Sequence, residues 1–146
     1  MRKLPVKAML AAIAFVLCLA AGEHAYAVRI AQPAPGFTLK DTAGRPISLE
    51  SFKGRVVILN FWSTNCPPCV AELPSLNALY HELKGQGLVV LGISLDPSVR
   101  PVKAMMERMH LEYPVVMDSE QTVFFDSYAL FGQPASVIVD KRGIVQ

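Results

Sequence analysis

The chain has 146 residues, of which 52% are hydrophobic and 18% charged. This composition excludes a disordered chain, and the length suits one domain of ordinary size. Residues 1–27 contain three of the 14 basic and one of the 12 acidic side chains, so 11 of each remain after them. Because the remainder has no net charge, we expect no nucleic-acid partner, which would require a strongly basic surface.

The N-terminus resembles a secretory signal peptide. A basic start is followed by the uncharged apolar stretch 8–22, and residues 25–27 read Ala-Tyr-Ala, with small residues where a signal peptidase cleaves. We therefore predict a signal peptide over residues 1–27 and one domain over residues 28–146, exported to the periplasm. An uncleaved anchor over residues 8–21, which would tether the domain to the inner membrane, stays open because this stretch is only slightly shorter than a bilayer span.

Removal of the leader, which contains Cys18, leaves two cysteines in a C-x-x-C arrangement, Cys66 and Cys69. A disulfide between them closes a loop too short to stabilise the fold much. Two cysteines also cannot complete a tetrahedral zinc site, so we expect no metal and no cofactor. An exported protein meets an oxidising compartment, in which such a pair can form a disulfide. Redox chemistry is therefore the leading interpretation of the pair.

After the leader, the sequence alternates between strand and helix patterns. The expected elements, in chain order, are an extended segment (28–36), a β-hairpin (37–40 and 47–49), a buried strand (55–62), a helix (66–84), a second buried strand (88–95), a helix (98–110), a short extended run (113–117), a short helix (120–130) and a strand (135–140). This alternation predicts an α/β fold.

Cys66 falls where a buried strand has ended and a helix begins. The helix dipole and the free N–H groups of a first turn favour a thiolate there, so we expect Cys66 to be the nucleophile. Cys69, one turn further into the helix, would then release the mixed disulfide that Cys66 forms with a substrate. Glu72 follows three residues later on the same face and can accept a proton from the buried thiol. A solvated helix glutamate is an equally compatible interpretation of Glu72 at this point.

Four motifs together resemble the exported TlpA/ResA/CcmG group of thioredoxin-like proteins, over residues 35–146. They are Asn60-Phe61-Trp62, Cys66-Pro67-Pro68-Cys69, Glu72-Leu73-Pro74 and Gly132-Gln133-Pro134. The resemblance implies a thioredoxin-like fold with an N-terminal β-hairpin and a central insert, and a protein-disulfide oxidoreductase activity of Cys66 and Cys69. It also implies that Glu72 is an active-site glutamate. Pro134 would be a cis-proline facing the cysteines, where the backbone of Gln133 pairs with an incoming peptide.

Three features depart from the group that the motifs resemble. Asn65 stands where tryptophan is common, and Asn60 stands where cytosolic thioredoxins have a buried aspartate. The sequence ends at Gln146, before the final strand and helix that the group normally adds. We therefore expect an incomplete C-terminus, with one apolar face of the sheet partly uncovered.

The resemblance further implies a reductant of protein disulfides, kept reduced by a membrane electron donor. Its cysteine-containing substrates would be apocytochrome c, before haem attachment, or the copper-site proteins of oxidases. A peroxiredoxin-like peroxidase is an alternative, although Leu59 and Ser63 stand where its proline and threonine would be. A non-catalytic copper metallochaperone is another, although the helical spacing of Met105, Met106 and Met109 is more typical of core packing.

Overall fold

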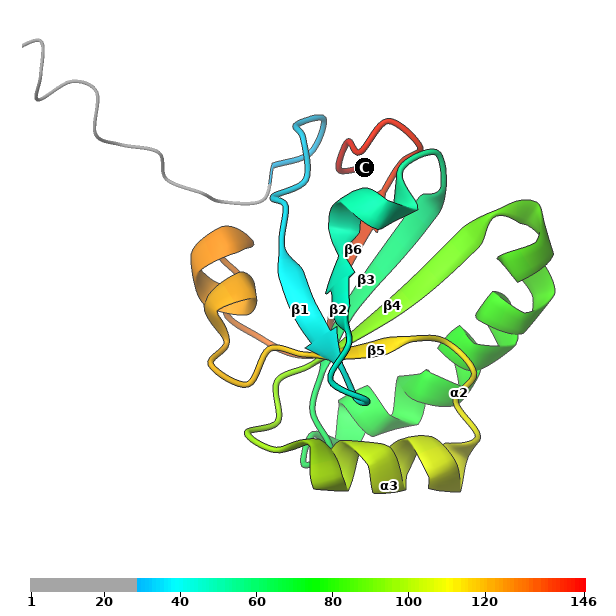
Figure 1. Cartoon of the computed structure of the whole chain (residues 1–146), viewed down its shortest axis with the longest axis vertical. Coiled ribbons are helices and arrows are strands. Elements are labelled where there is room, and N and C mark those ends of the chain that lie inside the picture. Colours follow the sequence, from blue (N-terminus) through cyan, green and yellow to red (C-terminus); the bar gives the residue numbers. More distant parts are fainter. Residues whose placement is uncertain (1–28) are drawn as a thin grey trace, which may run out of the picture.

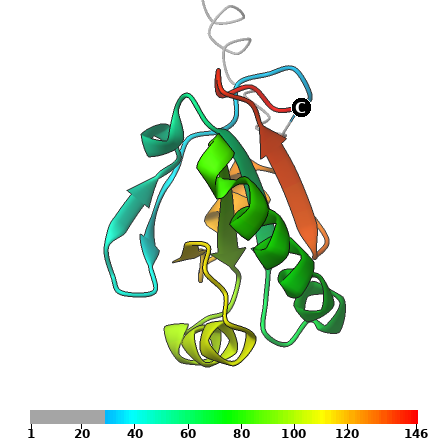
Figure 2. The same cartoon turned by 90° about the vertical axis from the view of Figure 1, so that its right-hand side faces the viewer.

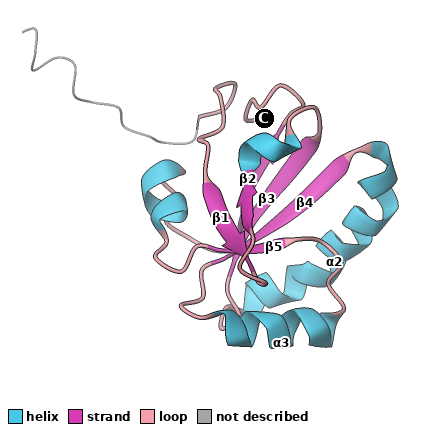
Figure 3. Cartoon of the chain, in the orientation of Figure 1, coloured by secondary structure: helices cyan, strands magenta, loops and turns pink. Residues whose placement is uncertain are grey.

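The computed structural model describes residues 29–146, so the predicted leader lies outside the described residues. Within this range, no helix combines the length and the apolar character needed to span a membrane. The elements (Figures 1 and 3) are strands β1 (Thr38–Asp41), β2 (Pro46–Ser48), β3 (Val56–Trp62), β4 (Leu88–Ser94), β5 (Val115–Met117) and β6 (Ala135–Val139), helices α2 (Pro67–Leu83) and α3 (Val99–Met109), and the short helical turns η1 (Leu49–Phe52), η2 (Lys84–Gln86) and η3 (Val123–Ser127).

The six strands form one mixed sheet in the order β2-β1-β5-β4-β3-β6. The two crossovers through α2 and α3 join parallel neighbours, β3 with β4 and β4 with β5. The hairpin β1–β2 and the last strand β6 add antiparallel pairs at the two sides. Parallel strands joined by helices confirm the predicted α/β class, and the carboxyl ends of β3 and β4 meet at one edge of the sheet.

Strand β3 is buried on both faces because its side chains alternate between two hydrophobic clusters. Val57, Leu59 and Phe61 belong to the cluster that η1 and η3 cover. Ile58 and Trp62 belong to the other cluster, together with residues of α2 and α3. Figure 2 shows α2 lying across one face of the sheet. The continuous apolar runs therefore predicted the central strands correctly, because a strand covered on both faces needs no polar alternation.

The segment 120–130 differs from the single short helix predicted there. Only Val123–Ser127 is helical, as a π-type turn, and Gln121 and Ala129 on either side have left-handed backbones with φ of 58° and 48°. Asp118 starts the turn, since its carboxylate accepts hydrogen bonds from the backbone N–H groups of Val123 and Phe124 at 3.3 and 2.9 Å. The spacing of the apolar residues did not predict that left-handed residues would interrupt the helix on both sides.

Gly92 lies in the middle of β4, where no larger residue fits. A Cβ atom there would stand 3.0 Å from Tyr113 Cε2, 3.1 Å from Trp62 Nε1 and 3.1 Å from Val115 Cγ2. We expect Gly92→Ala to lower the free energy of unfolding by about 1–3 kcal/mol, the usual effect of overpacking a core. Chemical denaturation measures this, with Gly85→Ala as the control, because a Cβ at Gly85 meets nothing within 4 Å. Equal stability of the two variants would contradict the prediction.

Candidate active site

The predicted cysteines lie at the edge of the sheet where β3 ends. The chain leaves β3 at Trp62, crosses a short loop and enters α2 at Pro67, so the loop ends on Cys66. Trp62, Cys66 and Cys69 all belong to the hydrophobic cluster beneath α2. The sequence-predicted strand-to-helix junction is therefore the place where the two sulfurs lie.

Cys66 is the N-cap residue of α2, and a disulfide joins it to Cys69. Its sulfur accepts a hydrogen bond from the backbone N–H of Cys69 at 3.3 Å. Pro67 and Pro68 occupy the first two helical positions and have no N–H to donate, so the N–H of Cys69 is the first in the helix that can reach the sulfur. Cys66 retains 8% of its accessible surface and Cys69 none, so the first cysteine is the one of the pair with any exposed surface.

A buried carboxylate holds the loop that leads to Cys66. Asp96 follows β4, and it accepts hydrogen bonds from Thr64 N at 3.0 Å, Thr64 Oγ1 at 2.5 Å and Ser94 Oγ at 2.9 Å. The position of Asp96 follows from topology, because the parallel strands β3 and β4 end at the same edge. Sequence analysis missed Asp96, although an aspartate directly after a buried strand was the available signal.

Removing this carboxylate is expected to destabilise the fold. In Asp96→Ala, the buried groups that donate to Asp96 lose their acceptor, and we expect the free energy of unfolding to fall by about 3 kcal/mol. Chemical denaturation measures the loss, and Asp126→Ala, at an exposed aspartate, is the control, with a change within about 0.5 kcal/mol. A loss in Asp96→Ala no larger than in the control would show that the carboxylate does not hold the loop.

Glu72 is half-buried on α2 and touches the centre of the sheet. Asn60 Nδ2, from β3, donates a hydrogen bond to Glu72 Oε1 at 2.6 Å and a second to Ser136 Oγ, on β6, at 3.2 Å. Asn60 is fully buried, whereas Ser136 is exposed. The carboxylate therefore lies between the buried interior and a side of the sheet that solvent reaches. Cys69 precedes it by one turn on the same helix.

Tyr113 approaches the same carboxylate from the segment before β5. Burial raises the pKa of the Tyr113 hydroxyl well above its usual range, and the negative charge of Glu72 raises it further. The hydroxyl is fully buried and has no hydrogen-bond partner among residues 29–146. Tyr113 therefore stays neutral and adds no charge beside Glu72.

The Gln133–Pro134 peptide bond is cis, as the resemblance implied for Pro134. The antiparallel register pairs Ala135 with Phe61, so Pro134 lies beside the end of β3 from which the chain runs to the cysteines. Gln133 is exposed there. The substrate-binding role predicted for Gln133 and Pro134 stays a prediction, and their place at the cysteine edge of the sheet is compatible with it.

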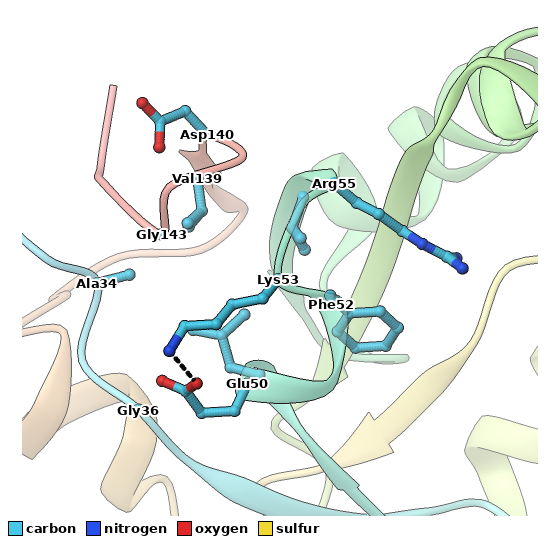
Figure 4. A pocket seen from close by; sticks show the side chains of 11 residues that line it. Ala34, Gly36, Glu50, Phe52, Lys53, Arg55, Val139, Asp140 and Gly143 are labelled. Atoms are coloured by element: carbon cyan, nitrogen blue, oxygen red, sulfur yellow. Dashed lines mark ion pairs between the residues drawn. The ribbon is translucent and has the colours of Figure 1, made fainter.

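A separate pocket lies at the opposite end of the sheet, where β3 begins and β6 ends (Figure 4). Ala34, Lys53, Val57 and Asp140 are among the residues that line it, and Lys53 pairs with Glu50 across its mouth at 2.6 Å. The whole length of β3 separates this pocket from Cys66. It therefore takes no part in the chemistry of the sulfurs.

Comparison with known proteins places the fold and the site in a family. The model of the AhpC/TSA family matches residues 30–146. The chain belongs to the AhpC/TSA family. Within it, the chain is similar to a ResA thiol-disulfide oxidoreductase from Bacillus thuringiensis subsp. konkukian, at 33% identity over 141 residues, which cover 91% of this chain and 81% of that protein.

Solved structures agree with this assignment. The thioredoxin domain of a thiol-disulfide oxidoreductase from Bacteroides vulgatus matches with a TM-score of 0.75 at 29% identity, covering 82% of this chain and 86% of that one. A secreted disulfide oxidoreductase from Mycobacterium tuberculosis, homologous to E. coli DsbE, matches with a TM-score of 0.68 at 26% identity, covering 75% and 80%. This AhpC/TSA family member therefore has the predicted thioredoxin-like fold.

The relatives and the Cys66–Cys69 pair together establish the chemistry in outline. The protein is a thioredoxin-like protein-disulfide oxidoreductase that exchanges thiols and disulfides with cysteine-containing substrate proteins. For one cycle of the reducing direction, we expect the Cys66 thiolate to attack a substrate disulfide, so that one substrate sulfur leaves as a thiolate. Cys69 would then attack Cys66, which forms the internal disulfide and frees the second substrate sulfur. The substrate gains two electrons and the enzyme dithiol loses them.

Proposed function

We propose that this protein works outside the cytoplasm as a reductant of protein disulfides, kept reduced by a membrane electron donor. The observation that supports the reducing direction is that few hydrogen-bond donors stabilise the Cys66 sulfur. Pro67 and Pro68 remove two potential N–H donors, so a single backbone donor, from Cys69, reaches the sulfur. A dithiol becomes strongly oxidising when its reduced, thiolate form is stabilised, so weak stabilisation favours a reducing pair.

The reduction potential of the Cys66–Cys69 pair tests this direction. Equilibration of the full chain with glutathione or thioredoxin buffers, followed by mass measurement of the alkylated thiols, gives the value. We expect a potential near that of thioredoxin, about −270 mV. A value near about −120 mV would make the protein an oxidant and overturn the proposal.

We propose that its substrates are paired cysteines that must be reduced before a cofactor is inserted, either the haem-attachment cysteines of apocytochrome c or the copper-site cysteines of an oxidase. The support is the relatedness to ResA and to a DsbE homologue, together with a site in which Cys66 but not Cys69 retains some exposed surface. Oxidised peptides with a C-x-x-C-H sequence and with a copper-site sequence serve as test substrates. Reduction of at least one of them is expected; stoichiometric Cu(I) binding, or peroxide consumption, without reduction of either peptide would overturn it.

We propose that the N-terminal leader directs export of the protein to the periplasm. This oxidising compartment is where its thiol-disulfide exchange would take place. The support is the basic and apolar pattern before Ala27. Fractionation of cells expressing the tagged full chain, with N-terminal sequencing of the product, tests it. A periplasmic product that starts at Val28 is expected, and a membrane-bound one would identify residues 8–21 as an anchor. Retention in the cytoplasm would contradict export in either form.

A further inference from the structure

Asn60 is a polar residue in the most buried part of the sheet. It occupies the middle of β3, paired with Gly92 of β4 and Ser136 of β6, and none of its surface is exposed. Its Oδ1 is buried without a hydrogen-bond partner among the described residues. Burying an amide oxygen unpaired is unfavourable, so packing alone does not account for asparagine at this position.

The other end of the amide has a specific partner. Asn60 Nδ2 donates to Glu72 Oε1 at 2.6 Å, a short bond to a carboxylate. A donor hydrogen bond of this kind favours the ionised carboxylate over the neutral acid. The hydrogen bond from Asn60 engages Glu72 Oε1 and leaves the other carboxylate oxygen to accept a proton. The amide itself neither gains nor loses protons, so it does not compete with Glu72 for them.

We propose that Asn60 is a positioning residue, whose buried amide orients the Glu72 carboxylate to take the proton of the Cys69 thiol. The proposal rests on the exchange reaction described above. The proton moves from Cys69 Sγ to Glu72, and the resulting thiolate attacks Cys66 Sγ in the mixed disulfide. The Cys66–Cys69 bond forms, the bond to the substrate breaks, and the substrate sulfur leaves as a thiolate that takes up a proton. The open side of the sheet at Ser136 gives water access to this carboxylate.

The groups around Glu72 show why the hydrogen bond from Asn60 acts mainly on this carboxylate. Tyr113, from the segment before β5, feels the charge of Glu72, and Cys69 precedes Glu72 by three residues on α2, which helical spacing places on the same face. From the sheet, Glu72 meets the uncharged amide of Asn60, which also bonds Ser136. Tyr113 stays neutral throughout the working range of pH. Removing the Asn60 donor therefore changes how readily the carboxylate ionises, without removing a charge from the site.

The test measures the rate at which Cys69 releases a preformed mixed disulfide on Cys66, as a function of pH, in the full chain. For Asn60→Leu, which keeps the branched shape of the side chain and removes the donor, we expect the acid limb of the profile to move up by about one pH unit, a tenfold change in proton affinity. Asn60→Asp, nearly isosteric, serves where Asn60→Leu does not fold. A second carboxylate beside Glu72 must share a proton with it, so the limb is again expected to move up.

Ser136→Ala is the matched control, because it removes the weaker partner of Asn60 Nδ2 and leaves the bond to Glu72. We expect its profile to match the wild type. Glu72→Gln tests the proton transfer to Glu72 separately from the positioning by Asn60. An upward move of the acid limb in Glu72→Gln, together with an unmoved limb in folded Asn60→Leu and Asn60→Asp, would overturn the role of Asn60 alone. An unchanged profile in Glu72→Gln would overturn the proton transfer itself, and with it the positioning role.

Discussion

Replacement of Cys66 by serine is expected to abolish thiol-disulfide exchange. Cys66 is the one residue of the pair with any accessible surface, and a serine hydroxyl in its place cannot form a disulfide with a substrate. Turbidimetric reduction of insulin by the full chain measures the loss, which we expect to be complete within the sensitivity of the assay. Cys18→Ser is the matched control, because the same substitution in the predicted leader leaves the pair intact. Full activity of Cys66→Ser would show that another group is the nucleophile.

Cys69→Ser is expected to give a different result, because it removes the resolving thiol and leaves the attacking one. The covalent adduct between Cys66 and a substrate cysteine should then accumulate. Non-reducing electrophoresis detects it, and mass spectrometry should place the bond at Cys66. Rapid turnover by Cys69→Ser, with no trapped adduct, would mean that the two cysteines do not act in the assumed order.

The strand and helix boundaries near the site were predictable from sequence, because the residues that define them act locally. The run 56–62 is apolar except for Asn60, and paired prolines after Cys66 mark the first turn of a helix, as the structure has it. The segment 120–130 was predicted less well, because its form depends on Asp118 capping a turn and on two left-handed residues. No periodic pattern encodes either of these features.

The contacts that complete the site were not predictable, because they join residues far apart in the chain. Asn60 was noted only as the residue in place of an aspartate, yet its amide contacts Glu72 and Ser136, which are 12 and 76 positions away. Asp96 and Tyr113 were not predicted as members of the site at all. Register between neighbouring strands brings these side chains together, and a single sequence does not specify register across separate strands.

Glu72→Gln is expected to slow exchange by about 100-fold at neutral pH, the usual contribution of a positioned general base. Glutamine has the same shape and can still accept the hydrogen bond from Asn60, but it cannot take the proton of Cys69. We therefore expect the fold to be retained while the chemistry is lost. Trp62 is the single tryptophan of the chain and lies in the same hydrophobic cluster as both cysteines, so its fluorescence in stopped flow follows the reaction.

The pH profile decides between a catalytic and a merely structural role for Glu72. In the wild type, we expect the rate to fall as the pH is lowered, because a protonated carboxyl at Glu72 cannot accept the proton. In Glu72→Gln, no carboxylate remains to titrate, so we expect this acid limb to move up to the range in which a free thiol ionises without help, about pH 8.5. Glu82→Gln, at an exposed position of the same helix, is the control and should keep the wild-type profile. A uniform slowing of Glu72→Gln at every pH, with the limb intact, would instead mean that the side chain supports the packing of α2 against the sheet.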